Sequence, residues 1–491
     1  MSSPPLPLDA LRGWAHLNGV DFLNVELQHI DGKGLGLVAT QRLSLTADDE
    51  GAKDDAPLVK VPRALVLSPG TIEDYAKVDQ NFRQLLDAAG HQSSRGDILL
   101  YLLAQLVSSK RGHAGRKGVA STAWTEYSKF LPRDVLVPTL WSEPERALLQ
   151  GTSLEDAVDA KMASLHSELH ELREKTLDLP FWNSFFWEDE AVTLGDWALV
   201  DAWYRSRCLE LPSTGDAMVP SIDMVNHSNG PDAYYDEDSD GDVEILLRPG
   251  FTVASGNEVT ISYGEFKSAA EMLFSYGFID GKTSKDEMTL ALDSFPDDPL
   301  AQAKLHVFEQ FPTVRLSRTE GVLKWESPYL HLMVLNEEDG LEFRVLQDTD
   351  GGRQLKLFWQ GSDVTNQAAN FEALTQEHPL CPMFRLRAVT VLAEQMTSQL
   401  ARIQSPPITE EPGQNEDAVL REACVQAAGV LKRIETSLLE AAVAALQEQV
   451  PSLQQTNLLA DDKVKAYLGS TEDTHNEQGV TAPANEEDDF S

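Results

Sequence analysis

Cysteine is scarce in this sequence, with 3 in 491 residues, at positions 208, 381 and 424. So few and so widely spaced thiols exclude a Cys-rich zinc cluster and fit a reducing compartment. Long apolar runs are also missing, since none approaches the ~20 residues that a membrane-spanning helix needs. Residues 1–19 lack the charged-then-apolar pattern of a secretory signal. We therefore expect an intracellular protein, cytoplasmic and/or nuclear, without a membrane partner.

Positive charge is the second shortage, because 40 Lys and Arg face 79 Asp and Glu and give a net charge of -39 at pH 7. Nucleic-acid binding uses basic faces, so we expect no direct contact with nucleic acid. An acidic surface attracts a basic partner and speeds their encounter. Acidic loops and tails also keep large proteins soluble, and composition alone leaves both roles open.

The length and the apolar pattern divide the chain. A chain of 491 residues is too long for one ordinary domain, so two or three domains are expected. From residue 72 to about 203 the pattern is helical, with helices expected at 96–107 and 154–177. Residues 382–404 and 416–449 read as long amphipathic helices. Residues 470–491 are acidic without Lys or Arg, which predicts a disordered tail.

Glycines recur at positions 32, 34 and 36, next to the alternating segments 22–27 and 35–39. This pattern predicts two strands around a glycine turn. Glycine allows the backbone to approach a ligand closely and to offer its N–H and C=O groups. A dinucleotide fingerprint is excluded because the third glycine spacing and the following helix are missing. Taken alone, the segment is better explained as a hairpin with a glycine bulge.

The stretch 218–280 carries two further motifs. Asn226-His227-Ser228 ends a mostly apolar run, and residues 259–263 alternate in the manner of a strand that Gly264 ends. A helix is expected at 268–276, with one apolar face formed by Ala269, Met272, Leu273 and Tyr276.

An acidic loop lies between these motifs and imitates the first half of a calcium loop. Asp236, Asp238, Asp240 and Gly241 occupy positions one, three, five and six. Position twelve is Leu247 instead of the bidentate Glu that such a site needs. We therefore predict an acidic hairpin turn and no metal site.

Together these motifs resemble the SET domain, in the branch typified by the Rubisco large-subunit lysine methyltransferase. The resemblance rests on the order of five segments: 33–39, Ser206-Arg207, Asn226-His227-Ser228, Tyr263-Gly264 and 268–278. It implies an α+β fold: a SET domain at 1–280 with a helical insertion at about 72–203, then a mainly α-helical substrate-binding domain at 281–469. A helix bundle without a binding role would show the same helical periodicity in this second part.

The resemblance also implies roles for individual residues. The cofactor S-adenosylmethionine would be held by Lys33, Gly34, Leu35, Gly36, Arg207, Asn226, His227 and Tyr263. Tyr263 would be the catalytic residue, through orientation and electrostatic support instead of proton abstraction. Substrate contacts would come from Arg207, Asp223 and Tyr276. His227 has a side chain suited to general-base catalysis, but the family points to a structural and cofactor-contacting role.

Two positions depart from the family pattern. The Ser-Arg-x-Phe motif reads Ser206-Arg207-Cys208-Leu209 here, and Ala269 stands where the family commonly has Asn. Arg207 is also open to a surface ion pair, and Tyr276 to a place on the helix core face. Cys208 is expected to be a core thiol, because no motif places a base beside it.

Lysine methylation needs a neutral amine held in line with the donated methyl group. An unperturbed lysine has a pKa of roughly 10.4, and an apolar channel next to a positive sulfonium disfavours its ammonium form. Aromatic walls desolvate the amine and still accept a methylammonium product through cation–π contact. The leading hypothesis is thus a protein-lysine N-methyltransferase.

The resemblance points to a non-histone substrate, such as a ribosomal protein or a translation factor, and we expect the enzyme to be a monomer. A basic ribosomal protein would suit the acidic charge. Two alternatives remain open: a protein-histidine methyltransferase of the same fold, and a non-catalytic SET-fold interaction protein.

Overall fold

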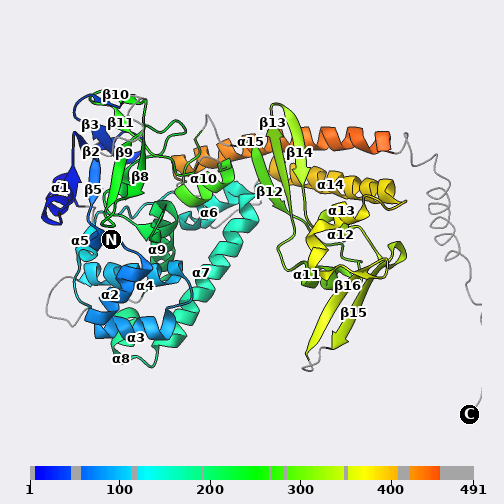
Figure 1. The fold of residues 1–491 in the computed structure, drawn as a ribbon, viewed down its shortest axis with the longest axis horizontal. Helices are drawn as coiled ribbons and strands as arrows, with labels where there is room; N and C mark the ends of the chain where they lie inside the picture. Colours follow the sequence, from blue (N-terminus) through cyan, green and yellow to red (C-terminus); the bar gives the residue numbers. More distant parts are fainter. Residues whose placement is uncertain are drawn as a thin grey trace, which may run out of the picture. The chain divides into compact units, whose positions relative to one another are not determined.

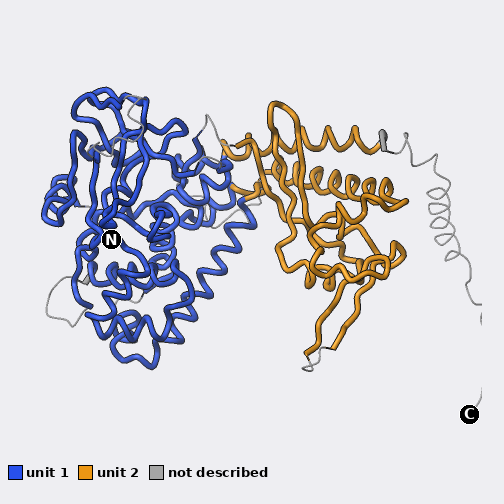
Figure 2. The backbone as a smooth tube through the Cα atoms, in the orientation of Figure 1, with its two compact units in different colours: residues 1–148, 154–284, 411–428 blue, residues 149–153, 285–410, 429–491 orange. Residues whose placement is uncertain are grey.

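The computed structural model describes residues 6–45, 57–111, 119–188, 192–264, 267–280, 285–347, 352–406 and 420–453 (Figure 1). The acidic tail expected at 470–491 lies outside these residues. The chain divides into two compact units (Figure 2). The first comprises Met1–Leu148, Leu154–Ser284 and Glu411–Ala428, and the second comprises Leu149–Ser153, Lys285–Glu410 and Gly429–Ser491.

The β part of the first unit consists of small antiparallel sheets. The glycine turn joins β2 (Val25–Ile30) to β3 (Gly34–Ala39), with Val25 opposite Ala39 and Ile30 opposite Gly34. The short strand β11 (Glu258–Val259) pairs with the other edge of β3. A second sheet has the order β1-β5-β9-β8, and two further pairs are β4 with β10 and β6 with β7. Their bounds are β1 Asp21–Phe22, β4 Leu43–Ser44, β5 Val59–Val61, β6 Cys208–Leu211, β7 Gly215–Met218, β8 Ala233–Glu237, β9 Val243–Leu247 and β10 Thr252–Val253.

Helices dominate the segment between β5 and β6, as the sequence predicts. The helix α4 (Ser94–Arg111) is buried along residues 98–107, because its apolar residues extend around all of its faces. The longest helix of this segment, α7 (Leu154–Thr176), is amphipathic and buries one side chain every two turns at 158, 165 and 172. The other helices of this segment are α2 Pro69–Val78, α3 Gln80–Ala89, α5 Ala123–Tyr127, α6 Glu143–Arg146, α8 Pro180–Asn183 and α9 Leu194–Arg207, whereas α1 Leu8–Leu17 precedes β1.

Two helix ends bring functional segments into place. Thr193 caps α9 in a reciprocal capping box with Asp196, and α9 ends at Arg207, where β6 begins. Ser268 caps α10 (Ala269–Tyr276) in the same way with Glu271. Gly277 ends α10 in the left-handed conformation, with φ at 82°. The N-terminal caps therefore fix where each helix begins, and Gly277 fixes the direction in which the chain leaves α10.

The second unit contains the two long helices that the sequence predicts and two sheets that it does not. The helices are α14 (Cys381–Gln404) and α15 (Glu422–Leu453), of which residues 429–453 belong to this unit. The sheets are three-stranded and antiparallel, in the orders β12-β13-β14 and β15-β16-β17. Their strands are β12 Glu287–Ala291, β13 Thr313–Thr319, β14 Val322–Glu326, β15 Leu341–Gln347, β16 Arg353–Trp359 and β17 Ser362–Asp363, and the shorter helices are α11 Ala301–Phe308, α12 Leu330–Met333 and α13 Phe371–Thr375.

Each unit has its own hydrophobic core. The first core gathers buried side chains from α4, α9 and the central strands, including Trp182 and Trp203. The second packs the sheets against α14 and α15 through residues such as Phe371, Phe384 and Leu439. Within the described residues, no helix is long and apolar enough to cross a membrane.

Candidate active site

A cavity of about 760 Å³ lies in the first unit, beside the glycine turn. Its wall includes the turn residues Gly32, Lys33, Gly34 and Leu35. Gly32 and Gly34 have φ values of 73° and 84°, which side-chain-bearing residues rarely adopt, and added Cβ atoms would meet nothing within 4 Å. These glycines are therefore required by the shape of the turn, and they leave the space beside it open.

Gly36 serves the same cavity indirectly. It is absent from the cavity wall, and a Cβ atom at this position would lie 2.8 Å from Asn226 Nδ2 and 2.9 Å from Glu258 Oε1. Gly36 thus makes room for the Asn226 amide, a role that differs from the predicted cofactor contact. Asn226 Nδ2 donates to the carbonyl of Leu35 (3.1 Å) and to Glu258 Oε1 (2.7 Å).

Glu258 is a site residue that the sequence analysis missed. Its second oxygen, Oε2, accepts a hydrogen bond from Lys33 Nζ at 2.6 Å. One carboxylate therefore holds both the glycine turn and the Asn226 side chain. The sequence offered no signal for this role, since Glu258 is one of many acidic residues and begins a two-residue strand.

Residues 226–228 lie alongside residues 261–263. Asn226 and Ser228 bracket Ile261, whose N–H donates to the Asn226 carbonyl and whose carbonyl accepts from the Ser228 N–H, both at 3.0 Å. The Tyr263 N–H donates to His227 Nδ1 at 3.0 Å. His227 Nδ1 is therefore already used as an acceptor, and burial lowers the pKa of the imidazole. A neutral, structurally engaged ring agrees with the implied structural role.

Tyr263 and Tyr276 form an aromatic wall with their hydroxyl groups engaged. Tyr263 donates its hydroxyl proton to the Val225 carbonyl (2.7 Å), and Tyr276 donates to the Tyr263 carbonyl (2.9 Å). Their ring centroids are 4.8 Å apart, and the Phe278 ring lies within 6.4 Å of both. Burial raises the pKa of Tyr263 well above its ordinary value and that of Tyr276 to about 12. Both phenols therefore stay neutral at physiological pH.

Arg207 and Asp223 form a buried ion pair. Arg207 Nη1 donates to the Asp223 carbonyl oxygen (2.8 Å) and lies 3.3 Å from its carboxylate. The Arg207 side chain is 16% exposed and that of Asp223 is 0% exposed, which rules out the surface ion pair that the sequence left open. Among the described residues, none accepts a hydrogen bond from the buried Arg207 Nε. A ligand group that accepts a hydrogen bond would satisfy this nitrogen.

Tyr127, a second residue that the sequence analysis did not assign to the site, holds Asp223 from the opposite side. Its hydroxyl donates to Asp223 Oδ1 and accepts from the Ser221 N–H at 2.8 Å. Ser221 is fully buried with φ at 71°, and begins the 3₁₀ turn η6 (Ile222–Met224) that carries Asp223. Burial raises the pKa of Asp223, although Arg207 and Tyr127 oppose the shift.

A second cavity of about 540 Å³ adjoins the first. Their walls share Ser206, Arg207, Asp223, Tyr263 and Tyr276. The remainder of the second wall includes Tyr204, Tyr235 and Cys208. Burial raises the pKa of the Cys208 thiol to about 12, so this cysteine stays protonated and is not a nucleophile. Two cavities thus meet at the residues that the sequence analysis assigned to catalysis and to the substrate.

The acidic loop is a hairpin turn between β8 and β9, as predicted. Lys60 lies among its carboxylates: it contacts Asp238, and its Nζ lies 3.4 Å from Asp242 and 3.0 Å from Glu244. Backbone N–H groups of the turn also donate to Asp238 Oδ1. Across the described ranges, no group of His, Cys, Asp or Glu side chains could hold a metal ion.

Comparisons with known proteins agree with this geometry, although no family model matches the chain. It is 27% identical to SET domain-containing protein 8 of Schizosaccharomyces pombe, over 76% of this chain and 81% of that protein. It is 26% identical to the chloroplastic ribulose-1,5 bisphosphate carboxylase/oxygenase large subunit N-methyltransferase of Pisum sativum, over 64% of this chain and 63% of that protein.

Among solved structures, Rubisco LSMT bound to AdoMet aligns with a TM-score of 0.64 at 20% identity, covering 92% of this chain and 94% of that one. The LSMT SET domain bound to lysine and AdoHcy aligns equally well, over 91% and 92%. The chain therefore has the α+β SET fold and is related to the Rubisco methyltransferase branch of SET-domain proteins, which confirms the predicted fold and resemblance.

Proposed function

We propose that this chain is a protein-lysine N-methyltransferase that uses S-adenosylmethionine. The observation that carries the proposal is the pair of cavities that share Arg207, Asp223, Tyr263 and Tyr276 as a common wall. A methyl transfer between two bulky partners needs such an arrangement, because donor and acceptor must approach from separate spaces and meet in line. Relatives named as lysine methyltransferases in Arabidopsis thaliana and Homo sapiens, and one named as an N-methyltransferase in Pisum sativum, support the same reaction class.

The first cavity fits S-adenosylmethionine, which supplies an activated methyl group on a positive sulfonium. Lys33 and Arg207 place positive charge in its wall, where a carboxylate would bind. The unpartnered Arg207 Nε gives this charge a free donor. The glycine turn leaves open space for close backbone contact, and Asn226 and His227 complete the wall. Lys33, Gly34, Leu35, Arg207, Asn226, His227 and Tyr263 are thus the proposed cofactor-binding residues.

The second cavity fits the side chain of a lysine. Four tyrosines line it (Tyr204, Tyr235, Tyr263 and Tyr276), and such a wall desolvates an amine and lowers its pKa. Because Tyr263 donates its proton to Val225, its oxygen has only acceptor capacity to offer an amine. Its raised pKa keeps it neutral, so Tyr263 orients the acceptor nitrogen and does not remove a proton. Arg207, Asp223 and Tyr276 would contact the substrate from the shared wall.

The substrate class is proposed from charge and from one distant relative. A net charge of -39 favours a basic protein partner. The ribosomal lysine N-methyltransferase set10 of Schizosaccharomyces pombe is 27% identical, over 41% of this chain and 36% of that protein. We therefore favour a non-histone substrate, a ribosomal protein or translation factor, methylated by a monomeric enzyme in the cytoplasm or nucleus.

The test is transfer of labelled methyl from S-adenosylmethionine into the proteins of an extract from source cells that lack this gene. We expect wild type to label a protein on lysine, as mapped by mass spectrometry, and Tyr263→Phe to abolish most of the labelling. Labelled histidine would replace the lysine assignment with the histidine alternative. A chain that fails to bind S-adenosylhomocysteine in calorimetry would be a non-catalytic SET-fold protein.

A further inference from the structure

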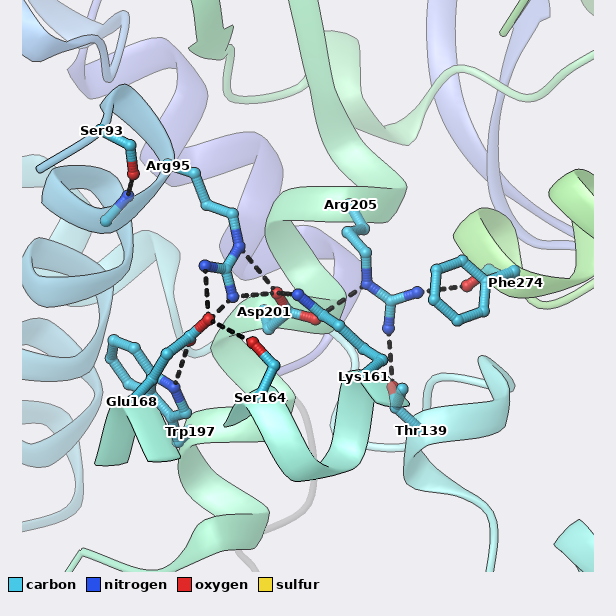
Figure 3. A network of polar contacts seen from close by, with 11 residues as sticks. Ser93, Arg95, Thr139, Lys161, Ser164, Glu168, Trp197, Asp201, Arg205 and Phe274 are labelled. Atoms are coloured by element: carbon cyan, nitrogen blue, oxygen red, sulfur yellow. Dashed lines mark hydrogen bonds and ion pairs between the residues drawn. The ribbon is translucent and has the colours of Figure 1, made fainter. Parts of the chain in front are cut away.

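A charge cluster surrounds a buried aspartate of α9 and brings together residues of several helices (Figure 3). At its centre is Asp201, whose side chain is 0% exposed. One carboxylate oxygen accepts from Arg95 Nη2 at 2.6 Å and lies 3.0 Å from Lys161 Nζ. The other accepts from Arg205 Nε at 2.8 Å. Burial raises the pKa of Asp201, but these cations outweigh burial and lower it overall.

Arg205 connects this cluster to two other elements. Its Nη2 donates to Thr139 Oγ1 at 2.6 Å, in the 3₁₀ turn η3 (Pro138–Leu140), and its Nη1 donates to the carbonyl of Phe274 in α10. Its guanidinium also lies 4.5 Å from the centroid of the Phe274 ring. With only 11% of its side chain exposed, Arg205 has every nitrogen engaged and little freedom to move.

Phe274 lies in the last turn of α10, directly before the residues that reach the site. Tyr276 ends the helix, lines both cavities and donates to the Tyr263 carbonyl. On its other side the turn is fixed by close packing, because a Cβ atom on Gly277 would lie 2.7 Å from the backbone carbon of Leu136. The end of α10 is therefore held by Arg205 at Phe274 and by backbone packing at Gly277.

We propose that Arg205, anchored by Asp201, is a positioning residue that sets the place of Tyr276 in the wall shared by the two cavities. This inference rests on the proposed function, since it assigns Arg205 a role in the acceptor lysine cavity. Arg205 acts through the Phe274 carbonyl on Tyr276, which we assign to lysine binding, whereas its hydrogen bonds within the described chain reach none of the proposed cofactor-binding residues. The two affinities should then respond differently to substitutions in the cluster.

The other half of the cluster provides a matched control. Glu168 accepts from Arg95 Nη1 and Nη2 at 3.1 and 3.0 Å and from Trp197 Nε1 at 3.0 Å. In Figure 3 these residues lie on the opposite side of Asp201 from Thr139 and Phe274. Glu168→Gln therefore weakens the cluster without touching the link to α10.

The experiment is calorimetric titration of the full chain with S-adenosylhomocysteine, and then of the saturated complex with Nε-monomethyllysine. For Arg205→Met we expect the affinity for the lysine probe to fall by about tenfold, because small misplacements of a wall are costly, while S-adenosylhomocysteine binds as in wild type. Arg205→Lys, which keeps a donor and the charge, should restore part of the loss. Asp201→Asn should reproduce the loss, because Arg205 then lacks its anchor.

Each outcome decides a different point. If Arg205→Met binds the lysine probe with wild-type affinity, the positioning role of Arg205 is overturned and the proposed function stands. The same holds if Glu168→Gln loses as much affinity as Arg205→Met, because the loss would then reflect general destabilisation. A loss in Arg205→Met with none in Asp201→Asn would make Arg205 a direct ligand contact and overturn the positioning role. If Arg205→Met does not fold, Asp201→Asn decides by the same criterion. Failure of wild type to bind S-adenosylhomocysteine overturns the proposed function itself.

Discussion

Two buried aspartates in the first unit have opposite electrostatic surroundings. Asp201 and Asp223 both have side chains with 0% exposure. Asp201 faces Arg95, Lys161 and Arg205, and its pKa is lowered. Asp223 faces one cation, Arg207, and its pKa is raised because burial outweighs that cation and the Tyr127 hydrogen bond.

The difference separates a structural carboxylate from one at a functional site. A buried charge is stable only when partners replace the water it has lost, and Asp201 has them in excess. Asp223 is undercompensated and lies where two cavities meet. Perturbed carboxyl groups of this kind gather at functional sites, where a ligand can complete the missing interactions. A positively charged cofactor and an amine are both ligands that would do so.

The largest expected effect comes from Asp201→Asn. The substitution keeps the shape but leaves three cations (Arg95, Lys161 and Arg205) around a neutral amide. Removing one partner of a buried ion pair costs about 3–5 kcal/mol, so we expect a loss of that order in the free energy of unfolding of the first unit. Urea unfolding followed by tryptophan fluorescence measures it. A loss below about 1 kcal/mol would show that the cations are already solvated in the native state.

Tyr127→Phe tests the other aspartate and should have a smaller effect. It removes the hydrogen bond to Asp223 and leaves the Ser221 N–H without an acceptor. An unsatisfied buried group costs about 1–3 kcal/mol, and we expect the loss in unfolding free energy to lie in that range. Because Asp223 then loses a donor that stabilises its ionised form, binding of S-adenosylhomocysteine should also change. Tyr101→Phe is the matched control, since its hydroxyl is also buried and meets Thr122 away from the cavities.

The pH dependence of stability should have opposite signs at the two aspartates. The pKa of Asp201 is lower in the folded state than in the unfolded state. As pH falls below roughly 3.9, the unfolded state therefore takes up the proton before the folded state does, and stability is lost until pH reaches the folded pKa. The raised pKa of Asp223 means that the folded state binds its proton first, so stability falls as pH rises above roughly 3.9 through the folded pKa. Each contributes at most about 1.4 kcal/mol per pH unit.

The measurement is the unfolding free energy of Asp201→Asn and Asp223→Asn relative to wild type from pH 3 to pH 7. The loss of unfolding free energy that Asp201→Asn causes should increase as pH rises from 3 past roughly 3.9. The loss that Asp223→Asn causes should decrease as pH rises above roughly 3.9. Parallel curves would contradict the assignment, because they would mean that neither carboxyl group has a shifted pKa.

Motifs in the sequence pointed to several residues that line the first cavity, because the motifs are short local patterns. Asn226, His227, Tyr263 and Tyr276 lie in two segments whose order and spacing identify them, and all four line the first cavity. Glu258 and Tyr127 were missed, since each acts through long-range contacts that no local pattern marks.

The strand β15 of the second unit was missed for a different reason. Only Leu341 of β15 is buried, and most of the strand is exposed on both faces. Strand prediction depends on alternation between a buried and an exposed face, and β15 does not have it. The long helices α14 and α15 bury one stripe each and were therefore predicted. Exposed hairpins are set by cross-strand pairing, which a single sequence does not reveal.

The smallest expected effect lies at the acidic hairpin, whose carboxylates are partly exposed, unlike the two buried aspartates. Lys60 has a side chain that is 33% exposed and contacts Asp238, Asp242 and Glu244. Solvent-exposed ion pairs contribute about 0–1 kcal/mol, so Lys60→Met should lower the unfolding free energy by no more than about 1 kcal/mol. Calcium should leave the melting temperature of wild type unchanged, because Lys60 already occupies the space among the carboxylates. A calcium-induced rise in wild type would restore the calcium-loop hypothesis, whereas a rise only in Lys60→Met would show that this one ammonium group separates a hairpin turn from a cation site.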